Sequence, residues 1–333
     1  MILAIESSCD ETSAAVVYQG KVLNNIIATQ SIHENYGGVV PELASRAHQS
    51  NIVPVIDSAL KQANVTKDKL DAVAFTKGPG LLGSLLVGTS FAKALALSLD
   101  IPLIAVDHME AHVMSHFIEE PYPQFPFLCL TVSGGHTQIV LVSNYLEMKV
   151  VGRTKDDAVG EAFDKIAKLL GFPYPGGPLL DQQAKKGNPL AFQFPRTQID
   201  GLDYSFSGIK TAVMYFLRDS IKKEDDFIQT YLSDICASVQ HTLIQMLLQK
   251  LEQAAEEYKI DQIAIAGGVS ANSGLRSGLQ KLANENDWTV YLPALQYCTD
   301  NAAMIAITAH YKFLQHQFED MDTAPNPRLS FGN

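Results

Sequence analysis

The sequence has few of the residues that disulfide-stabilised or thiolate-metal proteins need. It contains four cysteines in 333 residues, at Cys9, Cys129, Cys236 and Cys298, and no two of them form a CxxC pair. This spacing excludes a disulfide framework and argues against a thiolate zinc site. We therefore expect a protein of a reducing compartment, the cytoplasm.

Charged residues are also scarce, at 18% of the chain, and no long Ser, Gln, Pro or charge tract occurs. This composition excludes a largely disordered chain. The 36 acids outnumber the 25 bases, which gives a net charge of -11. A surface this acidic binds nucleic acid poorly, so a nucleic-acid role requires a local basic patch or a basic partner.

A membrane span is not expected. The N-terminus has no basic region of the kind that begins a signal peptide. The most apolar stretch, residues 81–104, is interrupted by Gly83, Gly88, Lys93 and Asp100. We interpret it as a buried helix followed by a strand.

The strand pattern occurs twice. Residues 2–27 and 127–151 each predict an antiparallel meander of three strands with a polar first turn. Residues 70–106 and 260–292 each predict a strand, a glycine-rich turn, a helix and a strand. At this length two domains are expected. The pattern therefore predicts a duplicated α/β fold with two lobes around a cleft, and chance similarity between strand patterns is the alternative.

Domain boundaries follow from this duplication. We predict an N-terminal lobe over residues 1–107, joined by a C-terminal helix over residues 301–333. A C-terminal lobe over residues 108–300 is predicted to carry most of the nucleotide and metal site. The proline-rich residues after Asp322 are expected to be frayed.

Glycine-rich turns end three of the predicted strands: GPG at residues 78–80, SGG at residues 133–135 and GG at residues 267–268. Any one of them can be a tight turn and nothing more. Glycine also lets the backbone approach a ligand, and a following helix offers free N–H groups to an anion. Three such turns at equivalent points favour nucleotide binding, although none matches a P-loop or a dinucleotide fingerprint.

His108 and His112 are the best candidates for metal ligands. On a helix their imidazoles lie one turn apart on the same face, which suits a first-row divalent metal. The zinc-protease motif HExxH is absent, because Glu110 stands two residues after His108 and faces away. Asp300 is the candidate third ligand. The alternatives are two ordinary surface histidines, and an N-cap role for Asp300.

Several carboxylates lie where a ligand site would need them. Asp10 and Glu11 occupy the first hairpin turn, where a kinase of this architecture holds a carboxylate near a metal ion or water. Asp181 follows a GGP turn and is suited to bind ribose hydroxyls. Asp164 lies on a predicted helix, and its alternative role is an ion pair with Lys168.

One run carries a specific resemblance: KALALSLDIPLIAVDHMEAHV, at residues 93–113, resembles the signature of the TsaD family, formerly called O-sialoglycoprotein endopeptidase. Further segments match in the family's order, from residue 4 to residue 306: AIESSCDET, YGGVVPELASRAH, LTVSGGHTQ, GEAFDKIAKLLG, YPGGP, DYSFSGIKT, AGGVSAN and CTDNAAMIA. The form of these motifs resembles the bacterial tRNA threonylcarbamoyladenosine transferase.

The resemblance implies the ribonuclease H-like fold of actin, Hsp70 and the sugar kinases. It also implies transfer of threonylcarbamoyl from L-threonylcarbamoyl-AMP to the exocyclic amine of adenosine 37, in tRNAs that read codons beginning with A. Bacterial members of the family work with a paralogue, TsaB, and an ATPase, TsaE. The rivals are an ATP-dependent phosphotransferase, a metallopeptidase and a non-enzymatic scaffold.

Residue roles follow from the same resemblance. His108, His112 and Asp300 would bind the metal, which is iron in this family, although zinc is also chemically suited. The expected contacts to the adenine nucleotide and acyl group are Thr131, Val132, Ser133, Gly134, Gly135, Asp164, Gly177, Asp181 and Asn272. The expected catalytic residues are Asp10, Glu11 and His136, of which His136 would shuttle a proton or serve only as a turn residue. The tail departs from the family, with Asn-Pro-Arg-Leu at residues 326–329.

Overall fold

A computed structural model of the protein describes residues 1–30, 33, 36–197 and 199–331. It divides into two compact units. The first comprises Met1–Tyr122, Ser143–Met148 and Pro293–Asn333, and the second comprises Pro123–Val142 and Lys149–Leu292. Residues 108–122 and 293–300 thus belong to the first unit, although we predicted both segments in the C-terminal lobe. The reason is that the helix beginning at His108 packs against the C-terminal helix of the first unit.

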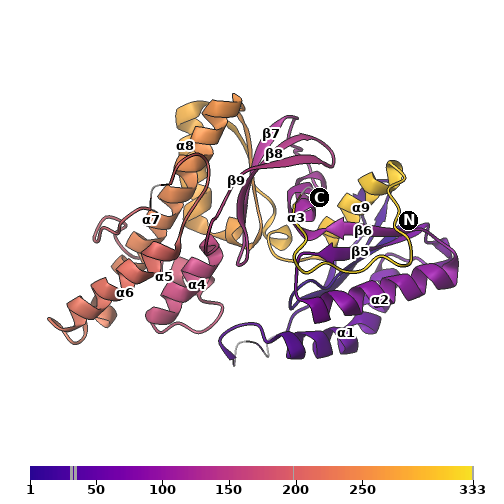
Figure 1. The fold of residues 1–333 in the computed structure, drawn as a ribbon, viewed down its shortest axis with the longest axis horizontal. Coiled ribbons are helices and arrows are strands. Elements are labelled where there is room, and N and C mark those ends of the chain that lie inside the picture. Colours follow the sequence, from indigo (N-terminus) through magenta and orange to yellow (C-terminus); the bar gives the residue numbers. More distant parts are fainter. Residues whose placement is uncertain (31–32, 34–35, 198, 332–333) are drawn as a thin grey trace. The chain divides into compact units, whose positions relative to one another are not determined.

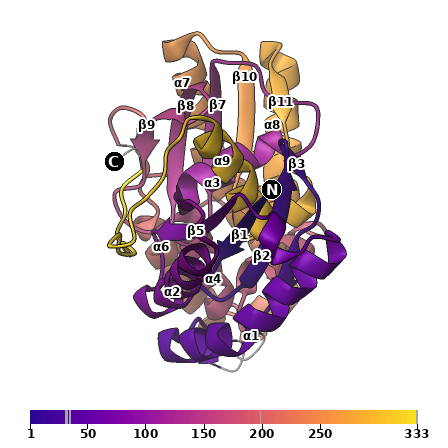
Figure 2. The same cartoon turned by 90° about the vertical axis from the view of Figure 1, so that its right-hand side faces the viewer.

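The first unit is built on a mixed sheet with the strand order β3-β2-β1-β5-β6, and β4 pairs with β2. Its strands are β1 (Ile2–Glu6), β2 (Thr12–Tyr18), β3 (Lys21–Val22), β4 (Ile26–Ala28), β5 (Ala72–Gly78) and β6 (Leu103–Asp107). Its helices are α1 (Pro41–Gln62), α2 (Leu82–Leu99), α3 (His108–Met114) and α9 (Ala302–Leu314), with short 3₁₀ turns at Lys67–Lys69, Ser115–Phe117 and Leu295–Tyr297. Figure 1 and Figure 2 show α1 and α2 on one face of this sheet and α9 on the other.

Strand alternation separates the core of the first unit into two layers. Leu3 and Ile5 of β1 belong to the cluster that packs against α1 and α2. Ile2 and Ala4 point to the opposite face and pack against α9. Because successive side chains of a strand alternate between faces, the next residue after Ile5, Glu6, faces the α3 and α9 side.

The apolar stretch at residues 81–104 forms α2 and β6, as the sequence predicts. Among the described residues, α2 is the one helix long and apolar enough to cross a membrane by length and composition. In this unit it packs on β5 and α1, and Leu85, Ala92 and Ala96 are fully buried.

The second unit repeats the plan, with the strand order β11-β10-β7-β8-β9. Its strands are β7 (Phe127–Val132), β8 (Thr137–Asn144), β9 (Glu147–Arg153), β10 (Gln262–Ala266) and β11 (Thr289–Tyr291). Its helices are α4 (Val159–Leu169), α5 (Gly176–Ala184), α6 (Ser207–Ile221), α7 (Phe227–Tyr258) and α8 (Ser273–Asn286), with a 3₁₀ turn at Gly268–Ala271. One apolar cluster fills the space between this sheet and its helices.

The duplication predicted from the sequence is present in the sheets. In each unit the first two strands are antiparallel, and the later strands join parallel on the other side of the first one. The two antiparallel meanders and the two strand–turn–helix–strand segments therefore occupy equivalent places in their own sheets. Parallel strands need a crossover connection, which α2 and α8 provide.

The C-terminal segment differs from the expectation of one helix over residues 301–333. The helix α9 ends at Leu314, residues 332–333 lie outside the described residues, and the segment between them is an ordered strap rather than a frayed tail. Glu319 donates its N–H to Leu103, Asn326 donates its N–H to Lys77, and the oxygen of Pro327 accepts from Gly80. The strap therefore lies over the turn that follows β5.

We predict that Gly78→Ala destabilises the first unit and releases the strap. Gly78 has a φ of +152°, and a Cβ atom there would lie 1.9 Å from the carbonyl oxygen of Asn326. The backbone strain alone costs roughly 1–3 kcal/mol. A denaturant titration should show this loss in the free energy of unfolding, and the C-terminus should be cut faster by a protease. Gly268→Ala, which meets open space, is the matched control. Equal stability of the two variants would contradict the prediction.

Candidate metal centre and nucleotide-binding segments

The two candidate histidines lie on α3, whose first turn is fixed by Asp107. This residue is the N-cap, and its Oδ1 accepts the N–H groups of Met109 at 2.7 Å and Glu110 at 3.1 Å. A carboxylate at an N-cap satisfies donors that the helix leaves unpaired. The helix then presents His108 and His112 on one face, with ring centroids 4.7 Å apart.

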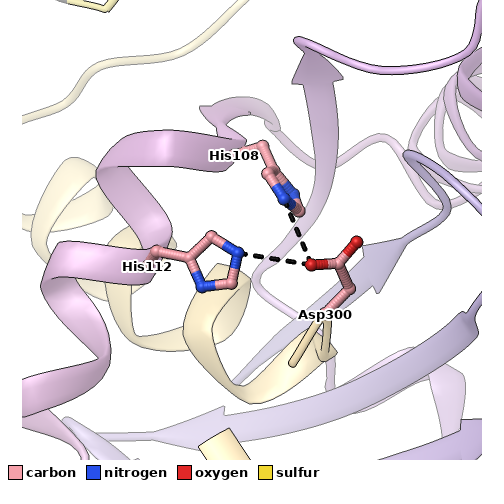
Figure 3. A group of neighbouring side chains, drawn as sticks. All are labelled: His108, His112 and Asp300. Carbon is pink, nitrogen blue, oxygen red and sulfur yellow. Dashed lines mark hydrogen bonds and ion pairs between the residues drawn. The ribbon is translucent and has the colours of Figure 1, made fainter. Parts of the chain in front are cut away.

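Asp300 meets both imidazoles. Its Oδ1 lies 3.3 Å from Nε2 of His108 and 3.2 Å from Nε2 of His112, as Figure 3 shows. The N-cap of α9 is Asn301, whose side chain accepts from Met304, so the capping alternative for Asp300 is wrong. The surface alternative for the histidines is also wrong, because His108 is 8% exposed and His112 is 1% exposed.

The charges at this cluster are strongly coupled. Burial by itself lowers the pKa of His108, but the carboxylates of Asp300 and Glu6 outweigh it and hold this pKa well above its ordinary value. Burial opposes ionisation of Asp300, yet the two histidines keep its pKa far below the usual range. Without a metal, the two carboxylates therefore favour the imidazolium form of His108.

The three side chains fit a metal ion. One donor atom from each of His108, His112 and Asp300 lies within 4.8 Å of the others. Two imidazole nitrogens and one carboxylate oxygen suit iron or zinc, and with three protein ligands a further coordination position stays open. The Nδ1 atom of His112 is buried and has no hydrogen-bond partner among the described residues, so Nε2 is the atom of this ring that is directed at the shared centre.

Glu11 of the first turn lies close enough to this cluster for the charge of Asp300 to affect it. Burial raises the pKa of Glu11 to about 9, with further increases from Asp300 and Asp10. Burial thus favours the protonated form of Glu11 in the metal-free chain, whereas a nearby cation would favour its charged form. Burial also raises the pKa of the Cys9 thiol, which makes this cysteine a poor nucleophile.

Glu110 belongs to a different contact. Its Oε2 lies 3.9 Å from the Nζ atom of Lys312 on α9, and burial raises its pKa to about 7 against the opposing effect of that lysine. The expectation that this side chain faces away from the histidines is therefore consistent with the partner that it has.

In the second unit, the SGG turn between β7 and β8 leaves its glycine backbone open. No atom lies within 4 Å of a Cβ built on Gly134 or Gly135. The oxygen of Ser133 accepts from the N–H of Gly160 in α4, where a Cβ atom would lie 2.5 Å from that oxygen. His136 belongs to the same turn, and its oxygen accepts from the N–H of Ser133.

Asp164, a predicted nucleotide contact on α4, bonds to the first turn of α5. Asp164 accepts the N–H groups of Gly176 and Gly177 at 3.0 and 2.9 Å, and burial raises its pKa despite these bonds. The alternative expected from the sequence was an ion pair with Lys168, but the carboxylate of Asp164 instead bonds to the first turn of α5. The carboxylate therefore satisfies the free N–H groups of α5.

Asp181 and Asn272 connect α5 to the start of α8. The Oδ1 of Asp181 accepts the hydroxyl of Ser273 at 2.7 Å. Asn272 is the N-cap of α8 and donates its side-chain amide to Gln240 at 2.8 Å. Ser273 and Gln240 were not singled out in the sequence, although the position of Ser273 beside Asn272 could have pointed to it.

The candidate residues thus form two groups. The first unit holds Asp10, Glu11, His108, His112 and Asp300. The second unit holds the remaining candidates, which are Thr131, Val132, Ser133, Gly134, Gly135, His136, Asp164, Gly177, Asp181 and Asn272. The roles of these residues stay predictions. Buried groups beside the histidines, above all Glu6, were missed because their contacts come from different strands.

Solved structures share this fold. HypF from T. kodakarensis matches with a TM-score of 0.63 at 15% identity, over 97% of this chain and 49% of that one. Component A of the (R)-2-hydroxyglutaryl-CoA dehydratase of Acidaminococcus fermentans matches with a TM-score of 0.53 at 14% identity, over 93% and 96% of the two chains. Together with the repeated sheets, these similarities define a duplicated actin-like protein with ribonuclease H-like lobes.

Sequence comparison defines the family. The model of the family TsaD, tRNA N6-adenosine threonylcarbamoyltransferase, matches residues 21–307. The protein of that name from Cytophaga hutchinsonii is 60% identical, over 99% of this chain and 96% of its own length. The one from Porphyromonas gingivalis is 56% identical, over 99% and 98%. The chain belongs to the TsaD family.

We predict that His108→Ala and His112→Ala each abolish stoichiometric metal binding while the fold persists. Each substitution removes one of the three side chains that supply a donor atom to the ion. Glu110→Ala, on the same helix, should bind metal as the unchanged protein does, because its carboxylate contacts Lys312. Elemental analysis of the folded variants measures this, and full occupancy in both histidine variants would contradict the assignment.

We predict that Asp164→Asn and Asp181→Asn weaken AMP binding without changing metal content. Loss of one hydrogen bond to a charged group costs about 1.5–3 kcal/mol, roughly tenfold or more in affinity. Asp234→Asn is the control, because Asp234 accepts one N–H, from Asn188, outside this group of contacts. Calorimetric titration measures the affinities, and values equal to that of the control would remove both carboxylates from the site.

Proposed function

We propose that this chain transfers a threonylcarbamoyl group from L-threonylcarbamoyl-AMP to the exocyclic amine of adenosine 37 in tRNAs that read codons beginning with A, with release of AMP. The carrying observation is the family match over residues 21–307 together with relatives of 54–60% identity along the whole chain. The buried His–His–Asp cluster supports the proposal, because an acyl transfer needs a group that polarises the acyl oxygen.

This transfer reaction does not need a nucleophilic side chain, because the acyl-adenylate carries its own leaving group. The amine nitrogen attacks the carbamoyl carbon, the bond from this carbon to the phosphate oxygen breaks, and AMP leaves with the electron pair. Adenine's exocyclic amine is a weak nucleophile, so positioning of the two substrates supplies much of the rate. A divalent metal ion held by His108, His112 and Asp300 would act as a Lewis acid on an oxygen of the acyl group.

The second unit is suited to hold the nucleotide. The space around the Cα atoms of Gly134 and Gly135 is open. We propose that the N–H groups of this turn bind a phosphate or a developing oxyanion, which helps most when the donors are already fixed. We propose that Asp164, Gly177, Asp181 and Asn272 hold the nucleoside. The attacking amine loses one proton, and we propose that His136 in the same turn receives it.

The first-turn acids have a different proposed part. A metal ion at the neighbouring centre would favour the ionised form of Glu11, which would then accept hydrogen bonds from a bound group. We propose that Asp10 and Glu11 orient the acyl group or a water molecule at the metal centre. The proposed metal is iron, with zinc as the chemical alternative, since both accept two imidazoles and a carboxylate.

We further propose that the chain acts with TsaB and TsaE in the cytoplasm. The net charge of -11 supports shared binding of tRNA, since an acidic chain alone attracts few phosphates. The exposed side chains of Leu82, Leu86 and Leu97, on one face of α2, offer an apolar surface for a protein partner. The free thiols of the described cysteines fit a reducing compartment.

A transfer assay tests the function. Threonylcarbamoyl-AMP labelled in its threonine should pass label to a tRNA with adenosine at position 37 and release one AMP per label. A tRNA with guanosine at that position, which lacks this amine, is the control. The assay is run with and without TsaB and TsaE. Release of ADP from ATP by this chain alone, in the absence of TsaE and without transfer of label, would instead support the phosphotransferase.

A further inference from the structure

Three neighbouring parallel strands of the first unit bring polar side chains to one face. β1 pairs in parallel with β5, and β5 with β6. Ile2 and Ala4, Ala72 and Ala74, and Ile104 and Val106 all belong to the core layer against α9. Glu6 comes two residues after Ala4 in the sequence. In the same way, Thr76 comes two residues after Ala74, and His108 two residues after Val106. The alternation of strand side chains therefore directs Glu6 and Thr76 toward the first residue of α3.

Glu6 is fully buried, with 0% of its surface exposed, and its carboxylate is surrounded by donors. The N–H of Ser8 donates to Oε1 at 2.5 Å, and the hydroxyl of Thr76 donates to Oε2 at 2.6 Å. The Nδ1 atom of His108 lies 3.2 Å from the same Oε2. A buried carboxylate is tolerated when its oxygens are paired in this way.

His108 and His112 differ in the environment of their second nitrogen. Both direct Nε2 at Asp300, but Nδ1 of His108 meets Glu6 while Nδ1 of His112 has no partner among the described residues. A histidine that binds a metal through Nε2 must carry its hydrogen on Nδ1, and an acceptor at Nδ1 fixes that form. Only one of the two rings has a carboxylate in that place.

We propose that Glu6 is a positioning residue of the metal centre, which accepts the Nδ1 hydrogen of His108 and thereby leaves Nε2 free to bind the ion. The inference rests on the proposed function of the His108–His112–Asp300 cluster. It adds a carboxylate that touches neither the ion nor the substrate. Thr76 and the N–H of Ser8 hold this carboxylate in its orientation.

The hydroxyl of Ser8 is the competing acceptor, since its Oγ also lies 3.2 Å from Nδ1 of His108. Glu6 is the stronger one, because a hydrogen bond from an imidazole to an ionised carboxylate is stronger than one between neutral groups. Ser8→Ala should therefore change metal affinity much less than Glu6→Gln does.

The test measures Zn²⁺ affinity of the purified full chain by competition with a chelator. Glu6→Gln keeps the size of the side chain and removes its charge, and it should weaken Zn²⁺ binding about 10–100-fold. Glu110→Gln is the control, since this half-buried carboxyl lies on the metal-bearing helix but contacts Lys312. Proton NMR of the zinc-loaded protein should show the Nδ1 hydrogen of His108 strongly downfield, as a hydrogen bond to a carboxylate requires, and should show it further upfield in Glu6→Gln.

Several results would overturn the inference. These are unchanged Zn²⁺ affinity in Glu6→Gln, an equal loss in Glu110→Gln, or a larger loss in Ser8→Ala. If Glu6→Gln does not fold, Thr76→Val decides: it should weaken Zn²⁺ binding while Thr76→Ser restores it, and equal affinities would reject the role. Wild-type protein that binds no Zn²⁺ or iron would reject the metal centre itself, whereas tight wild-type binding with an unaffected Glu6→Gln rejects the positioning role alone.

Discussion

The ion pairs around His108 are the interaction on which the first unit's polar interior depends. A charged imidazole with 8% exposure would be costly alone, and the carboxylates of Asp300 and Glu6 compensate for the lost water. The three groups come from β1, α3 and the segment before α9. The cluster therefore exists only when the sheet, the helix on its face and the C-terminal part of the chain are assembled together.

Sheet geometry explains why this charged group can be buried at all. The parallel strands β1, β5 and β6 are apolar on both faces until their carboxyl ends, where Glu6 and Thr76 follow Ala4 and Ala74 on the same face. Carboxyl ends of parallel strands are where α/β proteins place their ligands. Residues 319–329 of the strap lie over the neighbouring turn, and their backbone hydrogen bonds also hold the turn after β5 in place.

In the second unit, the same polar groups serve the fold and the proposed ligand. Asp164 satisfies the first N–H groups of α5, and Asp181 and Asn272 join α5 to the start of α8. A nucleotide that uses these side chains would bind to groups already fixed by hydrogen bonds. Such preorganisation lowers the entropy that binding must offset, and it also means that a change at these residues acts on both stability and affinity.

The sequence by itself determined the duplicated strand pattern and the pairing of His108 with His112, because strand and helix periods and an i,i+4 spacing are local properties. It also determined the family, through motifs along the whole chain. Only the tertiary structure decided that residues 108–122 belong to the first unit, that Asn301 rather than Asp300 caps α9, and that Glu6 reaches His108 across 102 positions. These contacts join segments remote in sequence, and strand order, register and packing bring them together, which no local pattern encodes.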